Sequence, residues 1–320
     1  MADKPSVLIT RRLPDSNLAA AHAAYHVTLN DRETPLSVEE ANHALGQYDA
    51  ILPTLGDGFG TAAFEGGPHR CKLLANFGVG YNHIDVAAAQ AAGVAVTNTP
   101  GAVTDATADI ALTLMLMSCR RAGEGERMLR ADAWPGWQPT QMLGLHMTGK
   151  TLGIIGMGRI GKAIARRAHH GFGMQIVFQN RSQVAEPGVP AQQLETLHEV
   201  MAAADVVVTA VPATPQTHHM IDASALAAMQ PHAHFVNIAR GDIVDEAALI
   251  AALKTGQIAG AGLDVYEFEP HVPDALKALE NVVLLPHLGT SALEVRQSMG
   301  DMALSNLAAH FAGMPLPNPV

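Results

Sequence analysis

A glycine-rich segment near the middle of the chain limits what this sequence can fold into. It reads GIIGMGRIG over residues 153–161, with a β-prone apolar run before it and an alanine-rich run of helical period after it. Gly156 permits a tight turn, Gly158 lets the backbone approach a pyrophosphate, and Gly161 lets the helix pack closely on its strand. The first N–H groups of that helix face the anion. The order of strand, turn and helix therefore predicts a dinucleotide-binding site.

The next strand, over residues 175–178, completes the spacing of a βαβ unit and ends in Asn180, Arg181 and Ser182. An acidic residue at this point would bind the ribose 2′-hydroxyl of NAD. No carboxylate is present to repel a 2′-phosphate, while a guanidinium and a hydroxyl can both bind one. The sequence therefore favours NADP(H), with NAD(H) as the alternative. Arg181 could also be an ordinary solvated arginine.

Composition places the chain among globular α/β proteins. Its 320 residues suffice for two domains, and 48% of them are hydrophobic. The net charge of −10 argues against a nucleic-acid surface. Two cysteines give neither a disulfide framework nor a thiolate metal site, and no signal core or run of 18 apolar residues occurs. We expect a soluble cytoplasmic protein that binds neither nucleic acid nor membrane.

Short strands alternate with helices along the whole chain, which predicts two parallel sheets, each doubly wound. Ser37 and Glu40 have the spacing of a capping box before a helix that reaches about Leu45. Long helices are expected over residues 104–121 and 291–311. The expected strands cover residues 7–10, 26–29, 50–54, 72–76 and 94–97 in the first series, and 151–155, 175–178, 206–209, 235–238, 260–264 and 282–285 in the second.

Three residues that could carry chemistry each follow a predicted strand of the second series. They are Arg240, Glu269 and His287. Ligands of an open α/β sheet bind beyond the carboxyl ends of its strands. A guanidinium can hold a carboxylate, an imidazolium can protonate a carbonyl, and a carboxylate beside the imidazole stabilises its protonated form. Singly, each has an ordinary alternative as a helix cap, surface carboxylate or unremarkable histidine; together they suit hydride transfer to a 2-oxo acid.

Two other stretches are candidates for binding. Gly78, Val79 and Gly80 form a second glycine-rich turn, whose N–H groups could bind a substrate carboxylate together with Arg240, or which could be a plain turn. The Trp arm, which we define as residues 133–139 with Trp134 and Trp137, is too irregular for a helix or strand and could pack on a partner. Paired histidines elsewhere lack neighbouring ligands at metal-binding spacing, so no metal is expected.

The ordered set of motifs FGVGYNHID, NTPGAVTDATAD, GMGRIG, NRS, NIARG, DVYEFEP and LPHLGT resembles the D-isomer-specific 2-hydroxyacid dehydrogenases, particularly their glyoxylate/hydroxypyruvate reductase branch. The resemblance implies a substrate domain of flavodoxin-like fold (1–98 and 287–320), a Rossmann cofactor domain (99–286), and a catalytic cleft between them. It implies the same roles for Arg240, Glu269 and His287. It also implies a homodimer built on the cofactor domains, in which Trp137 either reaches the partner's active site or only stabilises the contact.

The resemblance further implies a set of cofactor contacts spread over the strand ends of the second series. They are Thr107, Gly156, Gly158, Arg159, Ile160, Gly161, Asn180, Arg181, Ser182, Val211, Pro212, Thr217, Ile238, Ala239, Arg240, Asp264, His287 and Gly289. The expected function is NADPH-dependent reduction of glyoxylate or hydroxypyruvate to the 2-hydroxy acid. A reductase of bulkier 2-oxo acids, such as 2-ketogluconate or an arylpyruvate, and a nucleotide-sensing binding module remain as alternatives.

Overall fold

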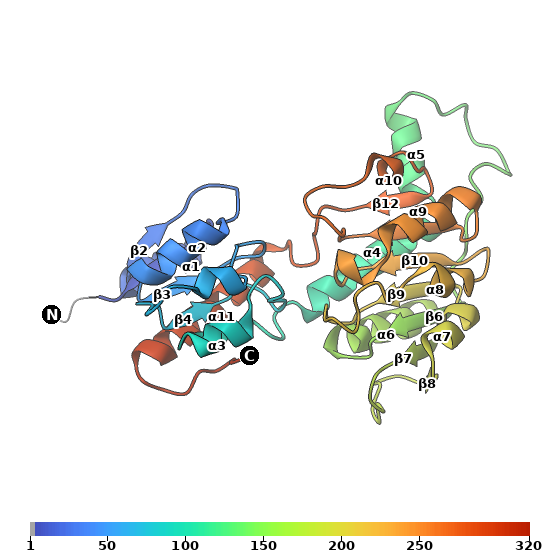
Figure 1. Ribbon diagram of the computed structural model, residues 1–320. Helices are drawn as coiled ribbons and strands as arrows, with labels where there is room; N and C mark the ends of the chain where they lie inside the picture. The colour runs from blue at the N-terminus through green and yellow to red at the C-terminus, as the bar shows by residue number, and fades with distance from the viewer. Residues whose placement is uncertain (1–3) are drawn as a thin grey trace. The chain divides into compact units, whose positions relative to one another are not determined.

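The computed structural model describes residues 4–320, which divide into two compact units (Figure 1). Unit 1 comprises the chain as far as Val103 together with Ser291–Val320, and unit 2 is Thr104–Thr290. The boundaries predicted from sequence lie after residues 98 and 286 instead. Residues 287–290 stay in unit 2 because Asp264 and Thr107 hydrogen-bond to this segment.

Unit 1 is a five-stranded parallel sheet in the order β2-β1-β3-β4-β5, which is the doubly wound order of flavodoxin-like folds. The capping box of α2 is present, because Ser37 Oγ accepts from Glu40 N while Glu40 accepts from Ser37 N. The strands are β1 (Ser6–Ile9), β2 (His26–Leu29), β3 (Ala50–Leu52), β4 (Leu73–Ala75) and β5 (Ala95–Thr97). The helices are α1 (Asp15–Ala24), α2 (Val38–Gln47), the short 3₁₀ helix η1 (Thr61–Phe64), α3 (Val86–Ala91) and α11 (Leu293–Phe311).

Unit 2 is a seven-stranded parallel sheet in the order β12-β11-β10-β9-β6-β7-β8. The order reverses between β6 and β9, and this switch point is where doubly wound folds bind a dinucleotide. The strands are β6 (Thr151–Ile155), β7 (Gln175–Gln179), β8 (Ala191–Gln193), β9 (Val206–Thr209), β10 (His234–Asn237), β11 (Gly260–Leu263) and β12 (Val282–Leu284). The helices are α4 (Thr104–Cys119), α5 (Ala122–Arg130), α6 (Arg159–Phe172), α7 (Leu197–Ala203), α8 (Ala223–Ala227), η2 (Gly241–Ile243), α9 (Glu246–Thr255) and α10 (Asp274–Lys277).

Two apolar layers enclose the sheet of unit 2. One lies under α4 and α6, and the other lies under α7, α8 and α9. Small residues allow the close approach: a Cβ on Gly262 of β11 would lie 2.9 Å from Leu114 Cβ of α4. Strands that are buried on both faces explain why the sequence shows continuous apolar runs here. The predicted fold class, with two doubly wound parallel sheets, is confirmed.

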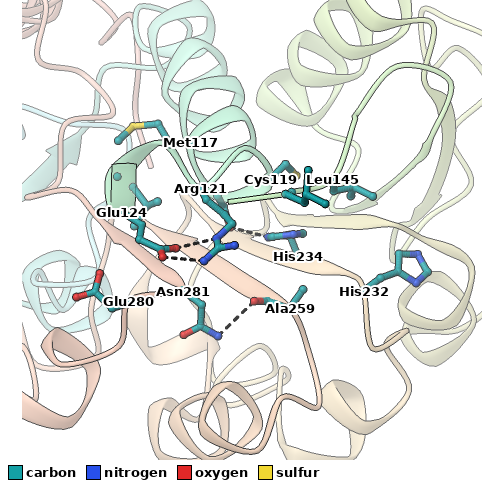
Figure 2. Close-up of a pocket in the computed structure, with 15 residues that line it drawn as sticks. Met117, Cys119, Arg121, Glu124, Leu145, His232, His234, Ala259, Glu280 and Asn281 are labelled. Carbon is teal, nitrogen blue, oxygen red and sulfur yellow. Dashed lines mark hydrogen bonds and ion pairs between the residues drawn. The ribbon is translucent and has the colours of Figure 1, made fainter. Parts of the chain in front are cut away.

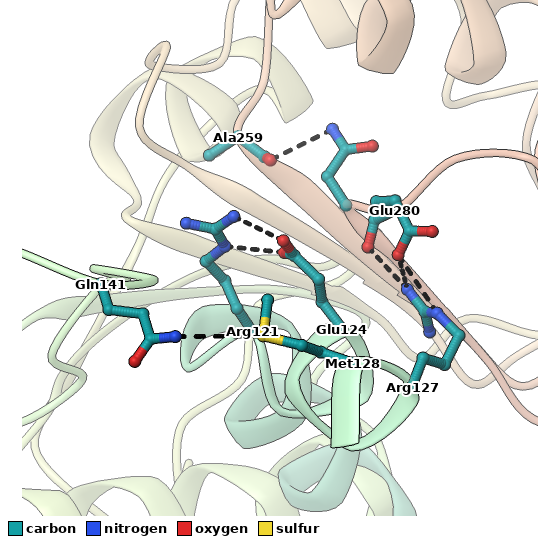
Figure 3. A network of polar contacts seen from close by, with 8 residues as sticks. Arg121, Glu124, Arg127, Met128, Gln141, Ala259 and Glu280 are labelled. Atoms are coloured by element: carbon teal, nitrogen blue, oxygen red, sulfur yellow. Dashed lines mark hydrogen bonds and ion pairs between the residues drawn. The ribbon is translucent and has the colours of Figure 1, made fainter. Parts of the chain in front are cut away.

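Among the elements of unit 2 that were not predicted are the strand β8 and the helix α5. The strand β8 is an edge strand of Ala-Gln-Gln and has no apolar pattern that would reveal it. The helix α5 is short, with charged residues at four of its nine positions, and it carries one ion pair at its start and one to the segment before β12 (Figure 3). Arg121 binds Glu124 through two nitrogens at 2.7 and 2.8 Å, and Arg127 contacts Glu280 just before β12. The Trp arm that follows α5 contains no helix or strand, as predicted.

A buried histidine at the start of β10 should make stability depend on pH. His234 Nδ1 lies 2.8 Å from Ser118 Oγ, and burial, with the charge of His232, lowers the pKa of His234 from 6.5 to about 4. Between these two pH values the unfolded chain binds a proton at this histidine that the folded protein does not. The contribution of His234 to the free energy of unfolding is therefore fully present above pH 6.5 and is lost as the pH falls towards 4. This one group should lower the free energy of unfolding by about 2 kcal/mol when the pH falls from 7.5 to 5.

Urea denaturation of wild type and a His234→Asn variant at both pH values measures this effect. The variant should have a lower free energy of unfolding than wild type at pH 7.5. The difference between the two proteins should be about 2 kcal/mol smaller at pH 5. His170→Gln, an exposed change on α6, serves as control. A gap that is the same at both pH values would contradict the role of His234.

Candidate active site

The glycine-rich turn between β6 and α6 has the geometry that a dinucleotide requires. Gly156 has φ +98°, a value that favours glycine, and a Cβ on Gly161 would lie 2.2 Å from Gly156 O. A Cβ on Gly158 would meet no atom within 4 Å, so the backbone is open to an approaching group. No side chain caps the start of α6 at Gly158, which leaves its first N–H groups available to an anion. These residues therefore fit a nicotinamide dinucleotide.

The three residues that follow β7 beside this turn differ in their surroundings. Asn180 Oδ1 accepts from Met157 N at 3.2 Å, so this side chain is committed to shaping the glycine turn. Asn180 Nδ2 donates to Ser182 O at 3.0 Å. Arg181 and Ser182 are exposed. A cationic and a hydroxyl side chain are thus accessible beside the turn, where a carboxylate would stand in a site built for the ribose 2′-hydroxyl.

The loop after β10 presents Arg240, and Asn237 organises this loop. Asn237 Oδ1 accepts from Thr209 Oγ1 at 2.7 Å and from Ala239 N at 3.0 Å, while its Nδ2 donates to Arg240 O at 2.8 Å. Burial lowers the pKa of Arg240, and the charges of Glu269 and Asp242 oppose this shift. Asn237 is not among the site residues predicted from sequence. Its only signal there is an amide side chain that directly follows the apolar residues Phe235 and Val236.

The loops after β11 and β12 bring Glu269 and His287 together. His287 Nδ1 lies 2.8 Å from Glu269 Oε2, and each side chain is 29% exposed. Burial alone would raise the pKa of Glu269, but the hydrogen bond and charge of His287, the N–H of Tyr266 and the charge of Arg240 together lower it. An ionised Glu269 fixes the ring through Nδ1 and leaves Nε2 to exchange a proton with a bound molecule.

His287 occupies an unusual backbone conformation that Asp264 supports. The φ of His287 is +54°, in the left-handed region. Its N–H donates to Asp264 O at 3.0 Å, and the Asp264 carboxylate accepts from Leu288 N at 2.6 Å and from Gly289 N at 2.8 Å. Burial raises the pKa of Asp264 despite these hydrogen bonds. Thr107 Oγ1 donates to Gly289 O at 3.1 Å, so α4 also holds this loop.

The remaining predicted cofactor residues lie on the same edge of the unit 2 sheet. In the loop after β9, Thr217 Oγ1 donates to Pro212 O at 2.8 Å and closes a turn. Ile238 and Ala239 are buried directly before Arg240. The structure thus brings these residues to the carboxyl ends of neighbouring strands, with Val211 following β9 and with Arg159 and Ile160 beginning α6.

In unit 1, the glycine turn after β4 has its carbonyl groups held by its own unit. Asn76 Nδ2 donates to Gly78 O at 3.0 Å and to Gly80 O at 3.1 Å, and Asn98 Nδ2 donates to Val79 O at 2.9 Å. Within residues 4–320, the N–H groups of Val79 and Gly80 form no hydrogen bond. They are therefore able to donate to an anion.

A cavity of about 560 Å³ lies elsewhere in unit 2, among the residues that precede β10, β11 and β12 (Figure 2). Its lining includes Ser118, Arg121, His234 and Asn281. This is the amino-terminal edge of the sheet, opposite to the edge where the strand ends gather the predicted site residues. The cavity therefore has no part in the site described above.

Over residues 4–320, no three His, Cys, Asp or Glu side chains are grouped so that they could hold a metal ion. No helix among those same residues is long and apolar enough to cross a membrane. In the Trp arm, the side chain of Trp137 is 79% exposed.

A family model and two curated relatives match this chain. The family model for the NAD binding domain of D-isomer specific 2-hydroxyacid dehydrogenases matches residues 112–289. The glyoxylate reductases of Thermococcus onnurineus and Pyrococcus furiosus are 40% and 41% identical to this chain, over 97% of it and 94% and 93% of their own lengths.

A solved structure is similar over both units. The NADPH-dependent glyoxylate/hydroxypyruvate reductase of Sinorhizobium meliloti, in complex with NADP and malonate, superimposes with a TM-score of 0.88 at 34% identity. The match covers 99% of this chain and 97% of that chain. Together with the family model and the full-length relatives, it shows that this chain belongs to the D-isomer specific 2-hydroxyacid dehydrogenase family.

Proposed function

We propose that this protein reduces small 2-oxo acids, such as glyoxylate and hydroxypyruvate, to 2-hydroxy acids with NADPH. The observation that carries the proposal is the 2.8 Å pair of His287 and Glu269, within the electrostatic reach of Arg240, on the sheet edge that also holds the dinucleotide turn. Curated relatives of about 40% identity are glyoxylate reductases, which supports the substrate class.

Each of the three residues has one task in this proposal. The bound nicotinamide supplies a hydride to the carbonyl carbon of the 2-oxo acid. Arg240 holds the substrate carboxylate, with two parallel N–H groups of its guanidinium matching the two oxygens. His287 Nε2 donates a proton to the carbonyl oxygen as the negative charge develops, and Glu269 stabilises the imidazolium before that transfer.

Residues of the nucleotide turn and of the adjoining loops hold the cofactor. The N–H groups at the start of α6 bind the pyrophosphate, since no side chain satisfies them. Thr107, Asp264 and Gly289 position the segment after β12 beside the nicotinamide. In unit 1, the N–H groups of Val79 and Gly80 serve as a binding site for the substrate carboxylate.

The protein acts as a homodimer in this proposal, and α5 with the segment after it supplies the contact surface. Large apolar side chains here are exposed, namely Leu129 (62%), Trp134 (51%), Trp137 (79%) and Leu143 (67%). A cluster of exposed apolar and aromatic residues is typical of a protein–protein contact. Trp137 is the residue that we propose contributes to the partner's site.

A single panel of assays tests the proposal. Oxidation of NADPH and of NADH is followed by absorbance, with glyoxylate, hydroxypyruvate, 2-ketogluconate and phenylpyruvate supplied separately. Turnover should be highest with NADPH and the two smallest acids. Turnover only with the bulky acids would change the proposed substrate. Absence of turnover in protein that binds NADPH would favour the nucleotide-sensing alternative.

Replacement of Arg181 by alanine tests the cofactor preference. The variant should lose about 10- to 100-fold in kcat/KM for NADPH, because a hydrogen bond to a charged group contributes about 1.5–3 kcal/mol. Its kcat/KM for NADH should stay unchanged, since that cofactor has no 2′-phosphate. Arg166→Ala, an exposed change on α6, is the matched control. Equal losses with both cofactors would contradict a contact to the 2′-phosphate.

A further inference from the structure

His219 links two of the loops that carry the proposed catalytic residues, although neither the motifs nor the proposed mechanism uses it. It lies in the loop after β9. Its N–H donates to Asp242 O at 2.9 Å, and two residues later Ile221 N donates to Ile243 O at 3.0 Å. Ile221 also forms an isolated parallel bridge with Val244. The backbone around His219 is therefore attached to the segment that directly follows Arg240.

The side chain of His219 is attached to the other loop. Its Nε2 lies 2.8 Å from Oε1 of Glu267, whose side chain is 14% exposed. Glu267 stands two positions before Glu269 in the loop after β11. His219 thus contacts the Arg240 loop through its main chain and the Glu269 loop through its imidazole.

The two loops also touch each other directly. A Cβ on Gly241 would lie 1.8 Å from the carbonyl carbon of Tyr266 and 2.2 Å from Glu267 N, so only glycine fits at this point. Glu267 N approaches Glu246 Oε1 at 3.4 Å. Burial raises the pKa of Glu246, and the nearby charge of Glu267 adds to the effect.

The backbone conformation of His219 is a second, independent indication that its contacts serve the active site. Its φ is +49°, and within residues 4–320 only five residues other than glycine have a positive φ, one of which is His287. Residues hold such a conformation where surrounding contacts over-determine it, and they gather at active sites. The main-chain bond to Asp242 and the side-chain bond to Glu267 are contacts of this kind.

From these contacts we infer that His219 and Glu267 form a positioning pair that holds Arg240 and Glu269 in register for the reaction. The inference rests on the proposed function, because it concerns the alignment of that same site. His219 touches neither substrate nor cofactor in this role; it acts through Glu267 and the main chain of residues 242–243. Small displacements of reacting groups reduce turnover far more than they reduce binding of a distant part of the cofactor.

The test compares wild type with His219→Gly and His219→Gln in glyoxylate reduction by NADPH. Glycine removes the imidazole and tolerates the positive φ, so kcat should fall about tenfold and KM for glyoxylate should rise, while KM for NADPH changes little. Glutamine retains an N–H donor and should restore most of kcat. Glu267→Leu, which removes the acceptor, should reproduce the kinetic pattern of His219→Gly.

The control is a second histidine–carboxylate pair on the opposite edge of the same sheet. His232 Nε2 lies 2.7 Å from Asp205 Oδ1, before β10, and contacts no catalytic loop. His232→Gly should leave kcat and both KM values unchanged. If His219→Gly and Glu267→Leu both kept wild-type kcat and KM in an active wild-type background, or if glutamine failed to restore kcat, the inference would be overturned while the proposed function stood. An inactive wild type would overturn both.

Discussion

Replacement of His287 by asparagine should lower kcat for glyoxylate reduction by about 10²–10⁴-fold, the range that general acid catalysis contributes. Asparagine tolerates the left-handed φ of +54° and keeps a donor towards Glu269, so the loop should retain its conformation. What it lacks is an acidic proton for the carbonyl oxygen. The affinity for NADPH, measured by fluorescence titration, should therefore be nearly unchanged.

The measurement is steady-state and single-turnover kinetics of purified wild type and variant. His170→Gln, the exposed change on α6, controls for the loss of a histidine far from the site. Urea denaturation of the same samples separates a loss of catalysis from a loss of folded protein. A kcat within about tenfold of wild type in a folded variant would be below the range for general acid catalysis and would show that another group supplies the proton.

Replacement of Arg240 by alanine should lower kcat/KM for glyoxylate by about 10²–10³-fold. Asn237 fixes the main chain of this loop, and Arg240 Nη1 donates to Ala239 O at 2.7 Å, so the guanidinium should meet the substrate carboxylate in one preferred orientation. Its removal also takes a cation away from the ionised Glu269. Unlike the His287 variant, this one should lose substrate binding as well as turnover.

Arg240→Lys refines the same experiment. Lysine keeps the charge but presents a point cation instead of a planar fork, so it should recover only part of the loss. Arg12→Ala, with a side chain 61% exposed in unit 1, is the matched control. Full activity in Arg240→Lys would mean that charge alone is needed. Unchanged KM for glyoxylate in Arg240→Ala would remove Arg240 from substrate binding.

Several features were determined by local sequence. The capping box of α2, the glycine turn after β6 and the alternation of strands with helices each depend on residues a few positions apart, and the structure confirms all three. The fold class followed from the alternation of strands with helices, and the family was indicated by the ordered motifs that resemble it. The strand β8 and the helix α5 could not be predicted, because an edge strand of Ala-Gln-Gln and a short helix with charged residues at four of its nine positions bury too little apolar surface to leave a pattern.

In the candidate site, too, some features could be predicted from local sequence and others could not. Arg240, Glu269 and His287 could be predicted from sequence because parallel strands end at one edge of a sheet, and a residue just after a strand must lie there. The contacts of Asn237 and His219 could not be predicted in this way. Their partners, Thr209 and Glu267, are 28 and 48 residues away, and only the folded chain brings each pair within hydrogen-bonding distance.

The sequence by itself thus indicated the alternation of strands with helices, the doubly wound sheets and the chemical identity of the groups at the strand ends, because each depends on short-range pattern. Tertiary structure alone decided how those groups are held. The positive φ of His287, the closeness of Gly241 to Tyr266 and the pairing of His219 with Glu267 arise from packing between loops that are distant in sequence. Sequence periodicity carries no information about such contacts, since they depend on the sheet order and the register of its strands.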